Sequence, residues 1–232
     1  MRTVQGIAYF KADLFTEYRL KPNHQVQTKL NLQALCDCLS LFGSGQQSKS
    51  SMTLSYQGDG HPWRLILEDE HMIVTRCEIK TMDFHPDEEE DLMNFEFQPA
   101  NVLSKIIMKA DALRETFSEL DAVSEYLEVS VQSSKPQLRL TTRAGLCGGV
   151  VHHDCYEGSS HMEKFVCTQA HTNKYRVNSL KPTGRVLQQA TKISMRTDNR
   201  GFLCLQYMLE YDESGSCCFV EFYCAPEVEG DD

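Results

Sequence analysis

The chain has 232 residues, of which 41% are hydrophobic and 24% charged, a balance typical of a folded protein rather than a disordered one. No hydrophobic signal region opens the sequence and no apolar run is long enough to span a bilayer, so we expect neither secretion nor membrane insertion. The ten cysteines then indicate reduced thiols in the cytosol or nucleus. Almost all of the formal net charge of −10 lies in Asp87–Asp91 and the C-terminal tail, which leaves room for a local basic surface.

The first part of the chain predicts one helix among several strands. A strand is expected at Thr3–Phe10. Apolar residues at helical spacing predict a helix over Asn31–Phe42, with Asn31 as its N-cap and Gly43 just beyond its C-terminus. Alternating apolar and polar residues and tight-turn signals then predict three antiparallel strands: Ser51–Tyr56, Trp63–Glu68 and Met72–Lys80.

An acidic stretch, Thr81–Gln98, fits an exposed connector to the second part of the chain. A stripe of seven apolar residues after it predicts a long helix over Ala100–Phe117. Period-two alternation predicts a strand at Leu127–Gln132. A short helix is expected near Ser179–Ala190, with Pro182 in its first turn.

Three further strands follow that helix: Lys192–Thr197, Phe202–Tyr211 and Cys217–Cys224. A helix followed by a three-stranded meander therefore occurs twice, which predicts two similar domains of antiparallel sheet with helices on one face, an α+β fold. We expect a first domain at residues 1–82, an acidic connector at 83–98 and a second domain with an acidic tail at 99–232. The first domain opens in a strand and has no counterpart of the Ala100–Phe117 helix, so its beginning is expected to be missing.

Four segments resemble the Rad-one subunit family of the DNA-damage checkpoint clamp, a heterotrimeric ring related to proliferating cell nuclear antigen. They are Leu35–Gly43, Leu113–Asp121, Arg196–Met208 and Cys218–Pro226. The resemblance runs from about Thr3 to Pro226 and implies a sliding-clamp fold whose first domain lacks roughly the first 50 residues of the family. What is lost would be the first strand, the first helix and the second strand of that domain.

The same resemblance implies a function without catalysis or cofactor. Such a subunit is expected in the nucleus, where the ring encircles double-stranded DNA at damage sites and serves as a platform for checkpoint and repair proteins. Its expected partners are the two other clamp subunits, the checkpoint clamp loader, DNA and repair enzymes, with no membrane. Exonuclease activity has been attributed to members of the family and is the alternative function.

Four basic residues are the candidates to face DNA, because phosphate contacts are independent of base sequence and suit a sliding ring. Lys105 and Lys109 lie four residues apart on the expected Ala100–Phe117 helix and would be neighbours. By resemblance to the replication clamp, Lys105 and Arg185 match inward-facing positions, and Lys181 precedes Arg185 by one turn. From the residues alone, a solvated helix face is the alternative. Arg114 falls closer to the apolar stripe and is expected to be structural.

Ring closure requires strand edges that pair between subunits. By family topology, the edge of the first domain is His71–Lys80, and that of the second is Gly148–Tyr156. The residues that we expect at these edges are Ile73, Thr75, Cys77, Val150, His152 and Asp154.

Two groups of residues could be mistaken for metal sites. Cys147, His152, His153 and Cys155 resemble a zinc cluster, but adjacent histidines on a strand project to opposite faces and the spacing fits no common zinc pattern. The run Asp87–Asp91 could suggest a nuclease, but consecutive carboxylates on a connector do not form the rigid cavity of a two-metal site. We therefore expect no metal. By family resemblance, Met82–Phe97 is a candidate surface for partner peptides, and its acidity favours basic partners.

Overall fold

The computed structural model forms two compact units, which are described separately. The larger unit comprises Met1–Glu17 and Met93–Asp232, and the smaller unit is Tyr18–Leu92. The structure describes residues 3–21, 25–41, 50–69, 72–82, 97–119, 124–143, 149–211 and 215–227. Gly43, Cys147, Gly148, the run Asp87–Asp91 and the last five residues of the tail lie outside the described residues, as does most of the acidic connector.

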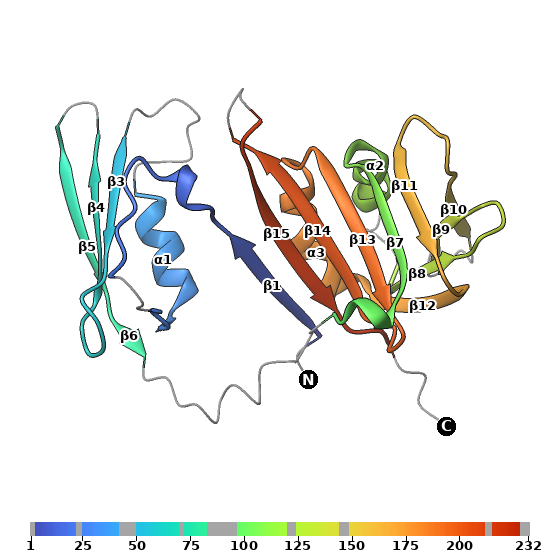
Figure 1. The fold of residues 1–232 in the computed structure, drawn as a ribbon, viewed down its shortest axis with the longest axis horizontal. Coiled ribbons are helices and arrows are strands. Elements are labelled where there is room, and N and C mark those ends of the chain that lie inside the picture. The colour runs from blue at the N-terminus through green and yellow to red at the C-terminus, as the bar shows by residue number, and fades with distance from the viewer. Residues whose placement is uncertain are drawn as a thin grey trace. The chain divides into compact units, whose positions relative to one another are not determined.

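A six-stranded antiparallel sheet forms one wall of the larger unit (Figure 1). Its strands follow the order β1 (Val4–Tyr9), β15 (Cys217–Cys224), β14 (Leu203–Glu210), β13 (Lys192–Asp198), β7 (Val102–Lys109) and β11 (Met162–Cys167). The strand β1 comes from the start of the chain and pairs with β15 near its end. The two ends of the described chain are therefore joined in one sheet.

The described residues of the larger unit also form a second antiparallel sheet and two α-helices. The sheet has four strands in the order β10 (Val150–Cys155), β9 (Leu138–Arg143), β8 (Tyr126–Val131) and β12 (His171–Arg176). The helices are α2 (Asp111–Glu119) and α3 (Val177–Leu187). Both lie on the same side of the six-stranded sheet (Figure 1).

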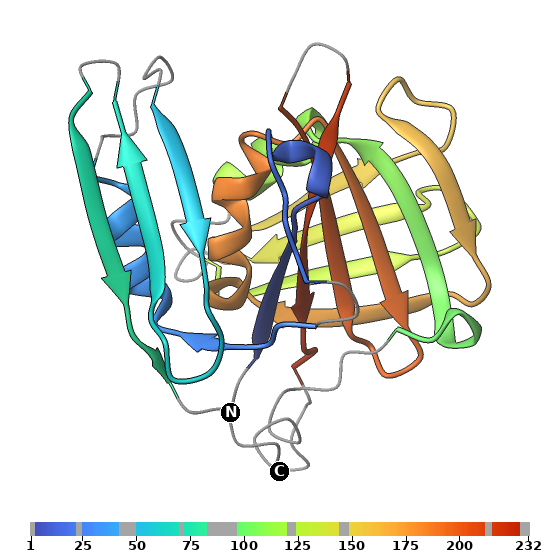
Figure 2. The same cartoon turned by 60° about the vertical axis from the view of Figure 1, so that its left-hand side comes forward.

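One hydrophobic core joins these four parts. Leu113 of α2 and Leu187 of α3 belong to a single buried cluster with Ile106 of the six-stranded sheet and Leu140 of the four-stranded sheet. In β8 and β14 alternate residues supply the core, as the period of two in the sequence requires. Figure 2 shows the helices and both sheets of this unit from a second direction.

The described residues of the smaller unit form one helix and two small sheets. The helix α1 (Leu32–Leu39) begins at the predicted N-cap, because the side chain of Asn31 accepts a hydrogen bond from the Ala34 amide at 3.1 Å. A three-stranded antiparallel sheet has the order β3 (Ser51–Ser55), β4 (Trp63–Glu68) and β5 (Val74–Ile79), and the short strands β2 (Lys29–Leu30) and β6 (Thr81–Met82) pair with each other. Of the described helices, none has the length and apolar character needed to cross a bilayer.

The predicted helix over Ala100–Phe117 is wrong. The segment forms a short 3₁₀ turn, the strand β7, and then the helix α2 from Asp111 onward. The buried positions of this strand, Ser104, Ile106 and Met108, also satisfy a period of two, and its β-branched residues favour the extended form. The strand satisfies the backbone by pairing with β13 and β11 on its two sides, which a helix could not do.

The repeated order of a helix and a three-stranded meander is confirmed, as α1–β3–β4–β5 and α3–β13–β14–β15. Two details differ from the prediction. The strand predicted at Thr3–Phe10 exists as β1, but it pairs with β15 and groups with the larger unit, so the smaller unit begins later than residue 1. The helix α3 begins at Val177, which puts Pro182 in its second turn rather than its first.

Candidate functional site

The helix α3 presents two exposed cations beside its buried face. Four of the five residues that it buries lie at helical spacing, Val177, Leu180, Thr183 and Leu187, and the fifth is Ser179. Lys181 and Arg185 are exposed and lie four residues apart, so they are neighbours on the helix surface. Two adjacent positive charges on a rigid helix give a local positive potential although the chain as a whole is acidic.

A cavity of about 420 Å³ lies between α2 and the side of α3 that carries Lys181 and Arg185. Its walls combine the two cations of α3 with neutral polar and apolar groups, which are Phe117, Ser118, Val177, Gly184 and Gln188. A side-chain β-carbon at Gly184 would meet nothing within 4 Å, so the absence of a side chain there keeps this part of the cavity open.

Arg114 fixes the geometry between the two helices. Its Nε donates a hydrogen bond to the Leu187 carbonyl at 3.2 Å, and its Nη2 donates to the Ala190 carbonyl at 2.6 Å. Leu187 is the last residue of α3 and Ala190 lies three residues beyond it, where the chain leaves the helix and its carbonyls need donors from outside it. An ion pair with Asp111 holds the guanidinium on α2. The predicted structural role of Arg114 is confirmed.

Lys105 and Lys109 do not lie on a helix, and the prediction that they are helical neighbours is wrong. Both belong to β7, where Ile106 and Met108 point into the core. Lys105 and Lys109 therefore point to the opposite face of the sheet, away from α2 and α3. On a strand, residues four positions apart are separated by about 13 Å. The structure does not bring these lysines together with Lys181 and Arg185.

The strand β10 forms one edge of the four-stranded sheet in the described residues. A backbone hydrogen bond from Gln132 to Gln137, at 3.0 Å, sets the alternation of hydrogen-bonded pairs in β8 and β9. The residue pairs observed between β8 and β9 and between β9 and β10 extend this alternation to the edge strand. The backbone N–H and C=O groups of Val150, His152 and Asp154 therefore point outward, away from β9. These are the three predicted edge residues of the second domain.

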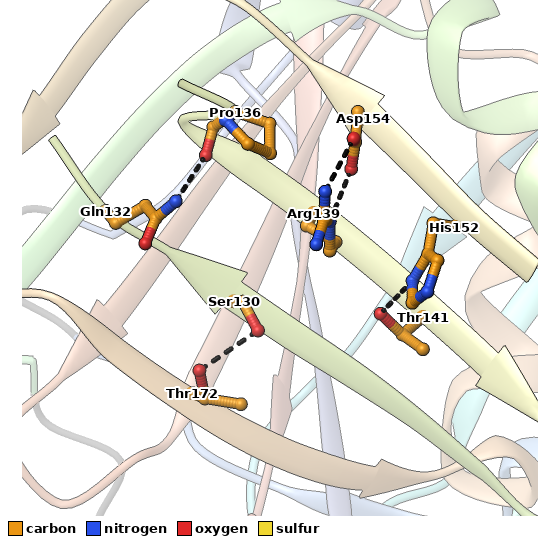
Figure 3. Close-up of polar contacts among 8 residues, drawn as sticks. All are labelled: Ser130, Gln132, Pro136, Arg139, Thr141, His152, Asp154 and Thr172. Carbon is orange, nitrogen blue, oxygen red and sulfur yellow. Dashed lines mark hydrogen bonds and ion pairs between the residues drawn. The ribbon is translucent and has the colours of Figure 1, made fainter. Parts of the chain in front are cut away.

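The outer face of the same sheet carries a ladder of polar pairs (Figure 3). Arg139 donates two hydrogen bonds to Asp154, at 2.7 and 2.9 Å, and this contact lowers the pKa of the Asp154 carboxyl and raises that of Arg139. Thr141 and His152 lie 3.0 Å apart, Oγ1 to Nδ1. Both pairs join β9 to β10 and hold the edge strand in register.

Of the residues that resembled a zinc cluster, the two histidines project from opposite faces of β10, and Cys147 lies outside the described residues. The side chain of His152 bonds to Thr141 on the exposed face of β10, and the next residue, His153, projects from the other face. Cys155 lies against the core, where burial raises the pKa of its thiol. Across the part of the chain that the structure describes, no three His, Cys, Asp or Glu residues are placed to hold one metal ion.

The strand β5 is an edge of the three-stranded sheet in the described residues. The Asp69 amide donates to the Ile73 carbonyl at 3.2 Å, and the alternation from this pair directs Thr75 and Cys77 toward β4. The backbone groups that point outward are those of Val74, Arg76 and Glu78. The predicted edge strand is present. The backbone groups of the predicted residues Thr75 and Cys77 pair with β4, however, and it is their neighbours whose groups face outward.

A buried polar cluster on the outer face of the six-stranded sheet was not predicted from the sequence. The Glu221 side chain is 5% exposed and accepts hydrogen bonds from four side chains, those of Tyr9, Arg196, Gln206 and Tyr223. Burial raises the pKa of the Tyr223 hydroxyl, as does its hydrogen bond to Glu221. Burial also raises the pKa of the adjacent Cys204 thiol to about 11.

Phe97, at the end of the acidic connector, packs against this cluster. Its ring centroid lies 5.6 Å from that of Tyr223, and the Arg196 guanidinium lies 5.9 Å from the Phe97 centroid. Of the predicted partner-peptide surface at Met82–Phe97, only the two end residues are described. The sequence signal that could have indicated the buried cluster is Glu221, a glutamate within the otherwise apolar Cys218–Pro226 segment. Most of its hydrogen-bond partners lie on other strands, so the sequence alone could not identify them.

Comparison with known proteins places the chain among checkpoint and repair proteins. The family described as Repair protein Rad1/Rec1/Rad17 matches residues 1–209. The cell cycle checkpoint protein RAD1 of Homo sapiens is 41% identical over 230 residues, which cover 98% of this chain and 78% of the human protein. The DNA repair protein Rad1 of Drosophila melanogaster is 28% identical over 232 residues, which cover 99% of this chain and 81% of that protein.

A more distant relative has an enzyme name. The DNA repair exonuclease REC1 of Mycosarcoma maydis is 25% identical over 194 residues, which cover 72% of this chain and 41% of that protein. The match to the family extends over most of the sequence, and the sheet-rich architecture with its repeated helix and meander is that of the sliding clamps. The chain therefore belongs to the Rad1 family of checkpoint clamp proteins.

Proposed function

We propose that this chain is a subunit of a heterotrimeric ring that encircles double-stranded DNA at damage sites and serves as a platform for checkpoint signalling and repair proteins. The observation that carries the proposal is the match to the Rad1 family over residues 1–209. The proposed partners are the two other checkpoint clamp subunits, the clamp loader and repair enzymes. The place where such a ring meets chromosomal DNA is the nucleus.

The edge strands β5 and β10 are the proposed subunit contacts. Each presents alternate backbone N–H and C=O groups to the outside, and such rows pair readily with a strand from another chain. The chain provides an internal example of the same kind of contact, because β1 and β15 come from opposite ends of the sequence and pair along six residues. Antiparallel pairing at two edges would leave each subunit bonded to two neighbours, as a closed ring requires.

The proposed DNA-facing residues are Lys181 and Arg185 of α3. Both are exposed cations on a helix that is anchored to the core and to Arg114. Contacts from such side chains to phosphates carry no sequence information and weaken with salt, which suits a ring that slides. Lys105 and Lys109 are not included, because they lie on the opposite face of the six-stranded sheet from α3.

We further propose that the subunit has no catalytic role. The alternative, a 3′–5′ exonuclease, is favoured by the name of the REC1 relative, which this chain matches at 25% identity. The two functions differ in one assay, in which the purified chain is incubated with Mg²⁺ and an end-labelled duplex. The clamp function predicts that no nucleotide is released. Release that co-purifies with the chain and is unaffected by Lys181→Glu with Arg185→Glu would support the nuclease.

The subunit contacts can be tested with proline substitutions at outward-facing amides. Proline removes an N–H group but breaks no hydrogen bond to the neighbouring strand at these positions. We expect Arg76→Pro in β5 and Val150→Pro in β10 each to weaken co-purification with the other two subunits by roughly tenfold or more.

Met52→Pro in β3 is the matched control, because the observed register also turns that amide outward, on the other edge of the same sheet as Arg76. Assembly should be retained in this variant. Equal assembly of all three variants with the wild type would contradict pairing through β5 and β10.

A further inference from the structure

The cavity between α2 and α3 has walls of two chemical kinds. Lys181 and Arg185 supply two positive charges, and the other five lining residues are uncharged. Phe117 and Val177 supply apolar surface, and Gln188 supplies an amide that can both donate and accept hydrogen bonds. A volume of about 420 Å³ falls within the range of ordinary small-ligand sites.

This combination matches the parts of a single nucleotide. Cations on one side suit a phosphate, an aromatic ring suits stacking against a base, and an amide suits the hydrogen-bonding edge of that base. The two helices are held together by the hydrogen bonds from Arg114 to the end of α3, so the walls are positioned before any ligand arrives. The cavity lies directly beside the cations that we propose contact the DNA backbone.

We propose that this α2–α3 cavity binds one unpaired nucleotide of DNA. The proposal rests on the proposed function, because it uses the same cations, and it adds a preference for a type of DNA. In a duplex the base faces are covered by stacking, so paired DNA can reach Lys181 and Arg185 through its phosphates but cannot fill the cavity. An unpaired nucleotide offers its base and phosphate together. The subunit therefore favours DNA that contains a single-stranded stretch.

Gly184 provides a variant that separates the cavity from the charge. The substitution Gly184→Leu fills the open space beside the helix, keeps both cations and replaces glycine with a better helix former. Gly184→Ala is the matched control, since its methyl group fills little of the cavity. Phe117→Leu is a second test, because it keeps an apolar side chain against the core but removes the aromatic face.

The experiment measures binding of the full chain to a short fluorescent single strand of DNA and to the same strand annealed to its complement. We expect Gly184→Leu and Phe117→Leu to weaken single-strand binding by roughly tenfold, the size of one lost base stacking contact, and to leave duplex binding unchanged. Gly184→Ala should bind both probes like the wild type. Lys181→Glu with Arg185→Glu should weaken binding of both.

Single-strand binding that survives in both Gly184→Leu and Phe117→Leu would overturn the nucleotide cavity. If the charge reversal still weakened both probes, the proposed DNA-facing role of α3 would stand without the cavity. If the charge reversal also had no effect, both proposals would fail. Circular dichroism of each variant, compared with the wild type, verifies that the loss of binding does not come from loss of the fold.

Discussion

The two copies of the helix-and-meander motif differ in how much of their apolar surface they bury. In the larger unit, α3 buries five of its residues, and the strands β13 and β14 that follow it belong to the central core. In the smaller unit, α1 buries none of its residues, and every residue of β3 is exposed. The buried hydrophobic residues of the described smaller unit are Leu65, Leu67 and Ile79.

The two units differ in burial because different elements pack against the three-stranded meander in each of them. In the larger unit, the four-stranded sheet and α2 supply the other side of a common core. The described residues of the smaller unit offer no sheet of comparable size, and Leu32 of α1 remains 70% exposed. Apolar area left in water forgoes about 25 cal/mol per Å² of stabilisation. We therefore expect the smaller unit to be the less stable of the two, although the order of elements is the same.

Truncation of a leucine in each helix should show the largest contrast. Leu187→Ala in α3 removes a fully buried side chain and should lower the free energy of unfolding of the larger unit by about 3 kcal/mol. Leu39→Ala in α1, where the leucine is 45% exposed, should lower that of the smaller unit by less than about 1 kcal/mol.

Each unit can be followed separately in urea. Fluorescence of Trp63, the single tryptophan, reports on the smaller unit, and amide exchange in β14 reports on the larger one. The smaller unit should unfold at the lower urea concentration, and amides of α1 should exchange faster than those of α3. Equal protection of α1 and α3 would show that the smaller unit is stabilised in a way that its burial does not explain.

The connection between α2 and α3 should have the next largest effect. Arg114→Ala removes the side-chain donors to the Leu187 and Ala190 carbonyls, of which that of Leu187 keeps a bond from the Ala190 amide at 3.3 Å, and should destabilise the larger unit by about 2 kcal/mol. Arg64→Ala is the comparison in the smaller unit, because Arg64 forms an exposed ion pair with Glu78 in β5 and its loss should cost less than about 1 kcal/mol. Thermal unfolding of both variants measures this contrast, and equal losses would be evidence against the anchoring role of Arg114.

Charge reversal on the two faces of the larger unit tests which face meets DNA. Lys181→Glu with Arg185→Glu should weaken duplex binding by the assembled ring and reduce the slope of log affinity against log salt by roughly 2, one unit for each lost phosphate contact. Lys105→Glu with Lys109→Glu changes the charge equally on the opposite face and should leave the slope unchanged. The reverse outcome would place DNA against β7.

The smallest expected effect concerns acid pH at the edge strand β10. The contact with Arg139 lowers the pKa of Asp154, so the ion pair stabilises the native state above the ordinary aspartate range and is lost as pH falls through the native pKa. Amide exchange at the β9–β10 pairing should therefore increase, relative to that in β14, as the medium becomes acidic. Asp154→Asn should abolish this dependence, and an unaltered dependence in that variant would assign it to another group.

The sequence predicted those elements whose local pattern has a single interpretation. Asn31 caps α1 as expected, and β4 and β15 have the predicted bounds. The segment after the connector was misassigned because its apolar residues fit both a helical and a strand period. Pairing with β13 and β11, which is a tertiary effect, decides between the two.

The candidate site residues were assigned to their elements unevenly for the same reason. Lys181 and Arg185 lie on a helix that the local pattern predicts. Lys105 and Lys109 were placed on a helix because their segment was predicted to be one, and the structure shows a strand there. The outward-facing amides of β5 depend on which residues pair across the sheet, as in the hydrogen bond from the Asp69 amide to the Ile73 carbonyl, and this cannot be read from side-chain alternation. The Glu221 cluster gathers residues from β1, β13, β14 and β15, and no local pattern could indicate it.

Topological retention on DNA tests the central claim most directly. The chain is assembled with the two other clamp subunits, loaded by the checkpoint clamp loader on a nicked circular plasmid, and washed with salt that removes electrostatic binding. A ring held by its β5 and β10 edges should stay on the circle and be released when a restriction enzyme linearises it. Loss from the circular plasmid in the wash, or equal retention on circular and linear DNA, would contradict the claim that this chain closes a ring around DNA.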